Sequence, residues 1–245
     1  MNIAEERNMT MIRNIGTIPE HDARSLARQR FIEISRFDQK DPKHCLLMNK
    51  GDSLREKLLA VINIRYTECF CEPSSFHEGV ITIGDWKITC NFFHRIPESC
   101  IEGIYLFILT AGEIQCESEN MLDSLFADTW GTSYVDAGVR LLKDRLTADM
   151  ELRFPGPGVK LTREFGPGYY GMPVSETSAF FHVLHGEELG MSLTDSGLLI
   201  PQKSCSGMFF AVNDLEFDEG PECIDCRGGS LGCQYCQIMQ KKSSI

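Results

Sequence analysis

The sequence lacks an excess of basic residues. It contains 24 Lys and Arg against 35 Asp and Glu, which gives a formal net charge of −11. Proteins that bind nucleic acid through the phosphate backbone need clustered Lys and Arg. The charge balance therefore argues against a nucleic-acid-binding function.

The sequence also lacks an apolar run long enough to cross a membrane, which takes about 20 residues. The best run, residues 104–111, has the length of a strand. The first ten residues mix acidic and basic side chains, unlike a secretory signal. We therefore expect a cytoplasmic protein with no membrane partner.

Several common catalytic motifs are missing as well. There is no P-loop, no Gly-x-Gly-x-x-Gly after a strand, no Gly-x-Ser-x-Gly elbow and no His-Glu-x-x-His. Among the six histidines, His182 and His185 are spaced to share a helical face, but they have no third ligand nearby in sequence. A surface position is the more typical reading of such a pair.

What the chain does contain is the composition of a globular protein, with 245 residues of which 42% are hydrophobic. It also has 11 cysteines, an odd number. With no export signal, these do not indicate a disulfide framework. Cys90 and Cys100 stand in apolar surroundings and are expected to be buried thiols.

The pattern of apolar residues predicts an α+β fold, with a twisted antiparallel or mixed sheet and flanking helices. Capping-box spacing at residues 17–20 and 53–56 predicts two helix starts. The expected helices follow these two boxes and also cover residues 122–150 and 175–185. The expected strands include 80–83, 86–90, 104–109 and segments within 193–212, with turns expected at Gly84-Asp85 and at residues 194–197. We divide the chain into an N-terminal helical region (1–65), an α+β core (66–215) and a Cys-rich tail (216–245).

Two motifs stand out in the second half of the chain. Residues 166–170 read Gly-Pro-Gly-Tyr-Tyr, a turn sequence. Residues 193–196 read Leu-Thr-Asp-Ser, and residues 201–207 read Pro-Gln-Lys-Ser-Cys-Ser-Gly. Taken alone, the first motif is a generic turn, and only the combination of the motifs is distinctive.

Together these motifs resemble the activation domain of cobalamin-dependent methionine synthase, as a short stand-alone member of that family. The resemblance implies a protein that holds S-adenosylmethionine over an oxidised corrinoid of a partner, so that the cobalt is reduced and remethylated. It implies that Arg163, Pro167, Gly168 and Tyr169 bind this methyl donor. The chain departs from the family pattern at Glu164, where the family has the arginine, and at residues 208–210, where the family has an aromatic hydroxyl.

Other polar residues are weaker candidates for the same cleft. Lys203, Ser204 and Ser206 lie on a strand-like segment, and Asp128 and Asp136 lie on the expected long helix. A solvated face explains these positions equally well or better.

The tail holds two Cys-x-x-Cys pairs separated by six residues. They comprise Cys223, Cys226, Cys233 and Cys236. Two such turns can close a tetrahedral site around Zn²⁺ or hold an iron–sulfur cluster. We expect one of these two metal sites, and the spacing does not choose between them.

The functional expectation is therefore a stand-alone protein that supports S-adenosylmethionine-dependent reductive reactivation of a corrinoid-bearing methionine synthase or methyltransferase. The partners would be this corrinoid protein and an electron donor. One alternative is a docking or electron-transfer module that no longer binds S-adenosylmethionine. Another is a structural subunit that bears zinc.

Overall fold

The computed structural model describes residues 12–116, 120–156 and 158–213. Its main sheet has five strands in the order β1-β2-β6-β10-β7, and every neighbouring pair is antiparallel. The strands are β1 (Arg13–Ile18), β2 (Ile64–Cys71), β6 (Ile101–Thr110), β7 (Lys160–Leu161) and β10 (Ser204–Val212). The predicted α+β fold is confirmed.

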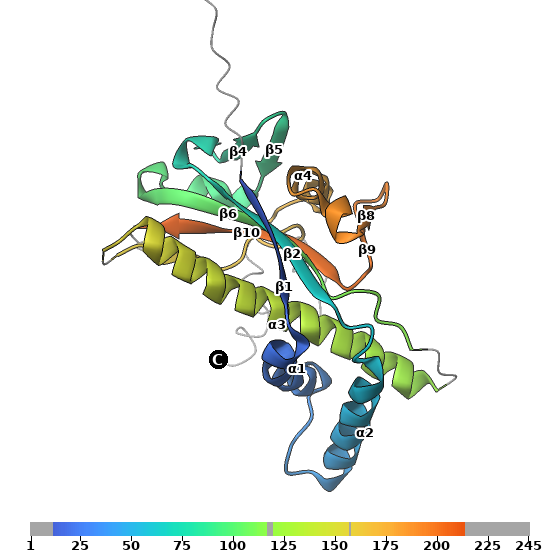
Figure 1. Ribbon diagram of the computed structural model, residues 1–245. Coiled ribbons are helices and arrows are strands. Elements are labelled where there is room, and N and C mark those ends of the chain that lie inside the picture. Colours follow the sequence, from blue (N-terminus) through green and yellow to red (C-terminus); the bar gives the residue numbers. More distant parts are fainter. Residues whose placement is uncertain (1–11, 117–119, 157, 214–245) are drawn as a thin grey trace, which may run out of the picture.

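The central strand β6 is buried on both faces because helices and hairpins cover the sheet from either side (Figure 1). Alternate side chains of a strand point to opposite faces, so β6 contributes to two separate cores. Its side chains are Tyr105, Phe107 and Leu109 in the first core, and Ile104, Leu106 and Ile108 in the second.

The first core, here the helix-side core, lies under three helices: α1 (Glu20–Ser35), α2 (Pro42–Leu58) and α3 (Met121–Arg153). Trp130 is fully buried there and stacks on Phe31, with ring centroids 4.3 Å apart. Its indole Nε1 donates a hydrogen bond to the carbonyl of Gly51 at 2.9 Å. A Cβ on Gly51 would approach the Phe31 ring to 2.6 Å, so this glycine lets α2 pack closely.

The second core, here the hairpin-side core, lies under α4 (Thr177–Val183) and two small sheets. Their strands are β3 (Phe76–His77), β4 (Val80–Ile83) and β5 (Trp86–Thr89) in one sheet, and β8 (Ser192–Leu193) and β9 (Leu199–Ile200) in the other. Short 3₁₀ helices connect these elements: η1 (Pro73–Ser75), η2 (Asn91–Arg95), η3 (Glu98–Cys100), η4 (Val174–Glu176) and η5 (Gly186–Leu189).

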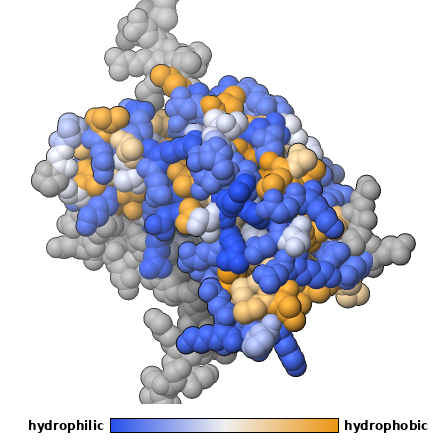
Figure 2. Space-filling model, turned by 60° about the horizontal axis from the view of Figure 1, so that its bottom comes forward, coloured by the Kyte–Doolittle hydropathy of each residue, from blue (hydrophilic) through white to orange (hydrophobic). Residues whose placement is uncertain are grey.

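Hydrophilic residues cover most of the surface seen in Figure 2, where hydrophobic residues form separate patches.

Most predicted elements are confirmed. The hairpin β4–β5 closes through Gly84 and Asp85, with Ile83 paired to Trp86 and Gly84 at a φ of +56°. The expected long helix is α3, and the expected turn of residues 194–197 connects β8 and β9.

Both predicted capping boxes were wrong. Thr17 lies in β1, and α1 begins at Glu20 after Pro19, without a side-chain cap. The second helix begins earlier than expected, at Pro42, where Asp41 Oδ1 accepts a hydrogen bond from the Lys43 amide at 2.8 Å. Ser53 lies inside this helix, and its hydroxyl bonds the Asn49 carbonyl instead.

The N-terminal part of the chain shares the main sheet, because β1 pairs along its whole length with β2. The boundary expected near residue 65 falls within β2 (Ile64–Cys71). The expected tail, residues 216–245, lies outside the described residues. Within the described part of the chain, no helix is both long enough and apolar enough to cross a membrane.

Candidate functional site

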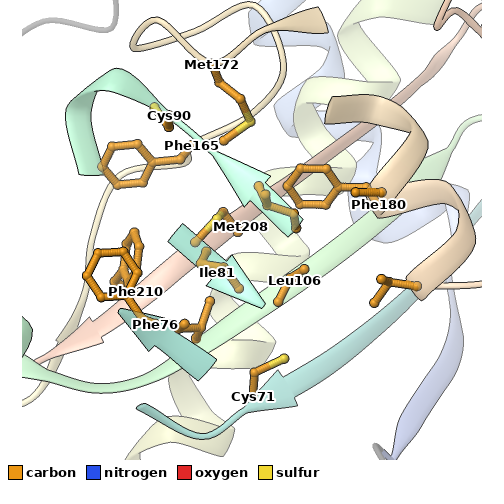
Figure 3. Close-up of a cluster of buried hydrophobic side chains, with 14 of the residues drawn as sticks. Cys71, Phe76, Ile81, Cys90, Leu106, Phe165, Met172, Phe180, Met208 and Phe210 are labelled. Carbon is orange, nitrogen blue, oxygen red and sulfur yellow. The ribbon is translucent and has the colours of Figure 1, made fainter. Parts of the chain in front are cut away.

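The turn at residues 166–170 is fixed to β10 at its first end. The Phe165 amide donates a hydrogen bond to the Met208 carbonyl at 2.9 Å, and the Met208 amide donates one to the Phe165 carbonyl at 2.8 Å. The Phe165 side chain is fully buried in the hairpin-side core, with Met172 at the other end of the turn (Figure 3). Both ends of the turn are therefore held by the core.

Two glycines allow the turn to lie directly against the strand. A Cβ on Gly166 would stand 2.9 Å from the Ser206 carbonyl oxygen, and a Cβ on Gly207 would stand 2.9 Å from the Phe165 carbonyl oxygen. Both obstacles are backbone atoms, which cannot move aside. The glycines of the two sequence motifs thus meet each other in the fold.

Within the turn, successive tyrosines have opposite roles. The Tyr169 amide donates to Gly166 at 3.0 Å and the Gly168 amide donates to Met172 at 2.9 Å, which closes a tight loop. Tyr170 has a φ of +53° and is fully buried, packed against the ring of Phe165. Tyr169 is 53% exposed. One tyrosine anchors the turn and the other is presented at the surface.

The structure brings three of the four predicted ligand-binding residues onto this turn. Pro167 is partly buried, and Gly168 and Tyr169 are exposed. Gly168 has a φ of +92°, and among the described residues, its chain neighbours aside, no atom lies within 4 Å of its Cβ position. Arg163 is exposed three residues before the turn. Their role in binding a ligand stays a prediction.

The carboxylate of Glu164, two residues before the turn, lies close to β10. Glu164 Oε1 lies 3.0 Å from the Cβ position of Gly207. Burial raises the pKa of the Cys205 thiol, and the carboxylates of Glu164 and Asp136 raise it further. Position 164 therefore places a carboxylate beside the start of β10.

A pocket of 280 Å³ lies at the start of β10, between α3 and the segment after β6. Lys203 and Asp128 line it, and their Nζ and Oδ1 atoms are 2.6 Å apart. The Lys203 Nζ also lies 3.2 Å from Thr132 Oγ1. The sequence analysis gave Lys203 and Asp128 as independent candidates. It did not predict that these two residues, 75 positions apart, form an ion pair. Glu113, a further lining residue, was missed.

The other weak candidates are used locally. Ser204 Oγ lies 2.6 Å from the Pro201 carbonyl oxygen, and Asp136 forms an ion pair with Arg30 at 2.6 Å. His182 stacks on Trp86 at 4.6 Å between centroids. Each of these side chains thus has a structural contact that explains it.

The predicted metal ligands Cys223, Cys226, Cys233 and Cys236 lie outside the described residues. Among the residues that the structure does describe, no group of three or more His, Cys, Asp or Glu side chains is placed to hold a metal ion. The predicted metal site in the tail therefore stays a prediction.

Sequence comparison finds no family model that matches the chain, and no curated protein matches it either. Comparison of structures finds a likeness to a crystal structure of the MetH reactivation domain bound to AdoHcy. The likeness has a TM-score of 0.58 and 14% sequence identity, and it covers 85% of this chain and 81% of that one. At this identity the match concerns the fold: this chain has the fold of the methionine synthase reactivation domain.

Proposed function

We propose that this chain binds S-adenosylmethionine at the turn of residues 166–170 and supports the reductive reactivation of a corrinoid-bearing methionine synthase or methyltransferase. The observation that carries the proposal is the fold shared over 85% of the chain with a reactivation domain solved with AdoHcy bound. The exposed turn, built where the two sequence motifs meet, supports it.

The residues at the turn fit such a ligand. A nucleoside with a sulfonium and an amino-acid end needs close backbone approach, an aromatic surface and a cation for its carboxylate. Gly168 offers open backbone, Tyr169 an exposed ring and Arg163 an exposed guanidinium. The carboxylate of Glu164, close to Gly207 beside the turn, favours a positive sulfonium.

When bound, S-adenosylmethionine supplies an electrophilic methyl group, and the protein contributes binding and orientation. The cobalamin belongs to the partner, and an electron donor of the reductase class supplies the electron that reduces its cobalt. No side chain of this chain has to act as acid, base or nucleophile. The role proposed for the turn is to hold the methyl donor facing the corrinoid of the partner.

Isothermal titration calorimetry with S-adenosylmethionine and AdoHcy tests the proposal. We expect saturable binding near one site per chain. Tyr169→Ala and Arg163→Gln should each weaken it about tenfold or more, which corresponds to about 1.4 kcal/mol. Both residues are exposed, so the variants should keep the fold.

Leu46→Ala is the matched control, because Leu46 is also an exposed apolar residue (70%) but lies on α2, away from the turn. It should bind like the unmodified protein. The proposal fails if neither ligand binds, or if Tyr169→Ala and Arg163→Gln bind as tightly as the control.

The second candidate function, a docking or electron-transfer module, depends on the spacing of Cys223, Cys226, Cys233 and Cys236. We propose that these thiolates hold Zn²⁺ or an iron–sulfur cluster. Metal analysis of anaerobically purified protein distinguishes the two, since zinc is colourless and a cluster absorbs visible light. A Cys223→Ser and Cys226→Ser double variant should lose the metal. Unmodified protein free of both metals would rule the site out.

A further inference from the structure

We propose that the pocket at the start of β10 is a second binding site, for a small molecule that carries both an ammonium and a carboxylate group, such as a free amino acid. This inference goes beyond the proposed function and does not depend on it. It rests on the walls of the pocket, on its charges and on its position.

The walls are fixed by backbone contacts. Residues 112–115 form one wall and residues 200–203 form another, with Asp128 of α3 as the third. The first two walls are joined, since the Ala111 amide donates to the Lys203 carbonyl at 2.8 Å. A Cβ on Gly112 would stand 2.9 Å from the Val61 carbonyl oxygen, so this wall also packs tightly from behind. The pocket is therefore preformed.

The charges of the lining are of both signs. The Lys203 side chain is only 15% exposed, and its stem packs on Gly131, whose Cβ position is 2.7 Å from Lys203 Cγ. An ammonium has three N–H donors, and Asp128 and Thr132 accept two of them here. The third suits a ligand carboxylate.

The acceptors for a ligand ammonium are carboxylates. The Asp128 side chain is 64% exposed although it pairs with Lys203, and Glu113 is exposed on the adjacent wall. With Lys203 they give the lining a charge of −1, which favours a ligand that presents an ammonium. The remaining lining includes Ile200, which is 38% exposed and offers an apolar surface for a short side chain.

The size and place of the pocket narrow the ligand further. At 280 Å³ it is at or just below the lower end of ligand pockets, which run from about 300 Å³ upward, so the ligand is small. Lys203 lies three residues before Ser206, the first β10 residue that contacts the turn, a separation of about 10 Å along an extended strand. The pocket is thus separate from the turn.

The probe is L-leucine, and its binding to the full chain is measured by saturation-transfer NMR. Two analogues separate the charges: 3-methylbutylamine lacks the carboxylate, and 4-methylpentanoate lacks the ammonium. We expect saturable leucine binding, with both analogues at least tenfold weaker. Lys203→Met should weaken leucine but leave the amine unchanged, whereas Asp128→Asn should weaken both.

Glu187→Gln is the control, because Glu187 is an exposed carboxylate in η5 that does not line the pocket. Lys203→Met and Asp128→Asn both remove an ion pair and could destabilise the fold. In that case Glu113→Gln is the deciding variant, and it should weaken the binding of leucine and of 3-methylbutylamine to the same extent. The proposal is overturned if leucine gives no saturable signal, if Glu113→Gln or Asp128→Asn binds like the control, or if AdoHcy displaces leucine. Failure of AdoHcy to bind would count against the proposed function only.

Discussion

At the scale of single residues, Gly166 and Gly207 determine how closely the turn approaches β10. Each has a backbone oxygen 2.9 Å from its Cβ position, on the segment that the other glycine belongs to. The sequence motifs contain both glycines, but their mutual contact follows only from the fold. A side chain at either position would separate the turn from the strand.

We predict that Gly207→Ala lowers the free energy of unfolding by about 1–3 kcal/mol, because the added methyl group meets the Phe165 carbonyl and the Phe107 ring. The control is Gly84→Asn, since Gly84 has a φ of +56° that Asn tolerates and an open Cβ position. It should change stability by less than about 0.5 kcal/mol. Urea denaturation measures both, and equal stabilities for the two variants would contradict the prediction.

The residue scale also marks the limit of what the sequence predicts about the site. Tyr169 and Tyr170 are adjacent and identical, and nothing in the sequence says which one is buried. The answer depends on the left-handed backbone of Tyr170, which turns its ring toward Phe92 and Phe165. Long-range pairs such as Lys203 with Asp128 are likewise set by packing of distant segments.

At the scale of elements, the start of α1 is tied to α3 by a partly buried group of hydrogen bonds. The Tyr134 hydroxyl donates to Glu20 at 2.5 Å, and Arg24 donates to the same carboxylate at 2.7 Å. Burial alone would raise the pKa of Glu20, but the hydrogen bonds of Arg24 and Tyr134 outweigh it and lower this pKa below its ordinary value of 4.5. The contact therefore stabilises the folded chain when Glu20 is ionised.

We predict that Glu20→Gln lowers the free energy of unfolding by about 1–2 kcal/mol at pH 7. Because the folded pKa of Glu20 lies below the unfolded one, this stability is present above pH 4.5 and is lost as the pH falls through the folded pKa. The difference in the free energy of unfolding between the unmodified protein and Glu20→Gln should therefore become smaller as the pH is lowered. Urea denaturation at pH 7 and pH 3.5 checks it, and a gap that stays constant would contradict the pKa argument.

Elements with strong internal periodicity were predicted well, and those that depend on partners were not. The apolar repeat of α3 and the Gly84-Asp85 turn are local signals, and both are confirmed. The edge strand β1 was missed because its residues are mostly exposed and form a strand through pairing with β2. The start of α2 has a local sequence signal, an N-cap Asp41 followed by Pro42. This signal was missed because the prediction followed the apolar residues further along the helix.

At the scale of the whole molecule, the two cores share strands, β6 and β10 among them. Leu106 and Phe107 are neighbours on β6, are both fully buried, and belong to opposite cores. Neither core can lose its packing without exposing a face of β6. The described part of the chain should therefore unfold as one unit.

The two tryptophans of the sequence report on this cooperativity. Trp130 is in the helix-side core, and Trp86 stacks on His182 over the hairpin-side core. In Trp86→Phe and in Trp130→Phe, the remaining tryptophan should give a fluorescence midpoint in urea equal to that from far-UV circular dichroism of the same variant. A fluorescence midpoint that differs from the circular dichroism midpoint in either variant would show independent unfolding.

The turn at residues 166–170 also bears on how this fold can diversify. The residues that hold it, Phe165 and Tyr170, are buried, whereas Gly168 and Tyr169 face outward and bear little of the packing. Substitutions at Tyr169 can therefore accumulate without cost to the scaffold, whereas the φ of +92° at Gly168 strains any residue that has a side chain. Related chains can therefore differ in ligand specificity at this turn while they keep the same fold.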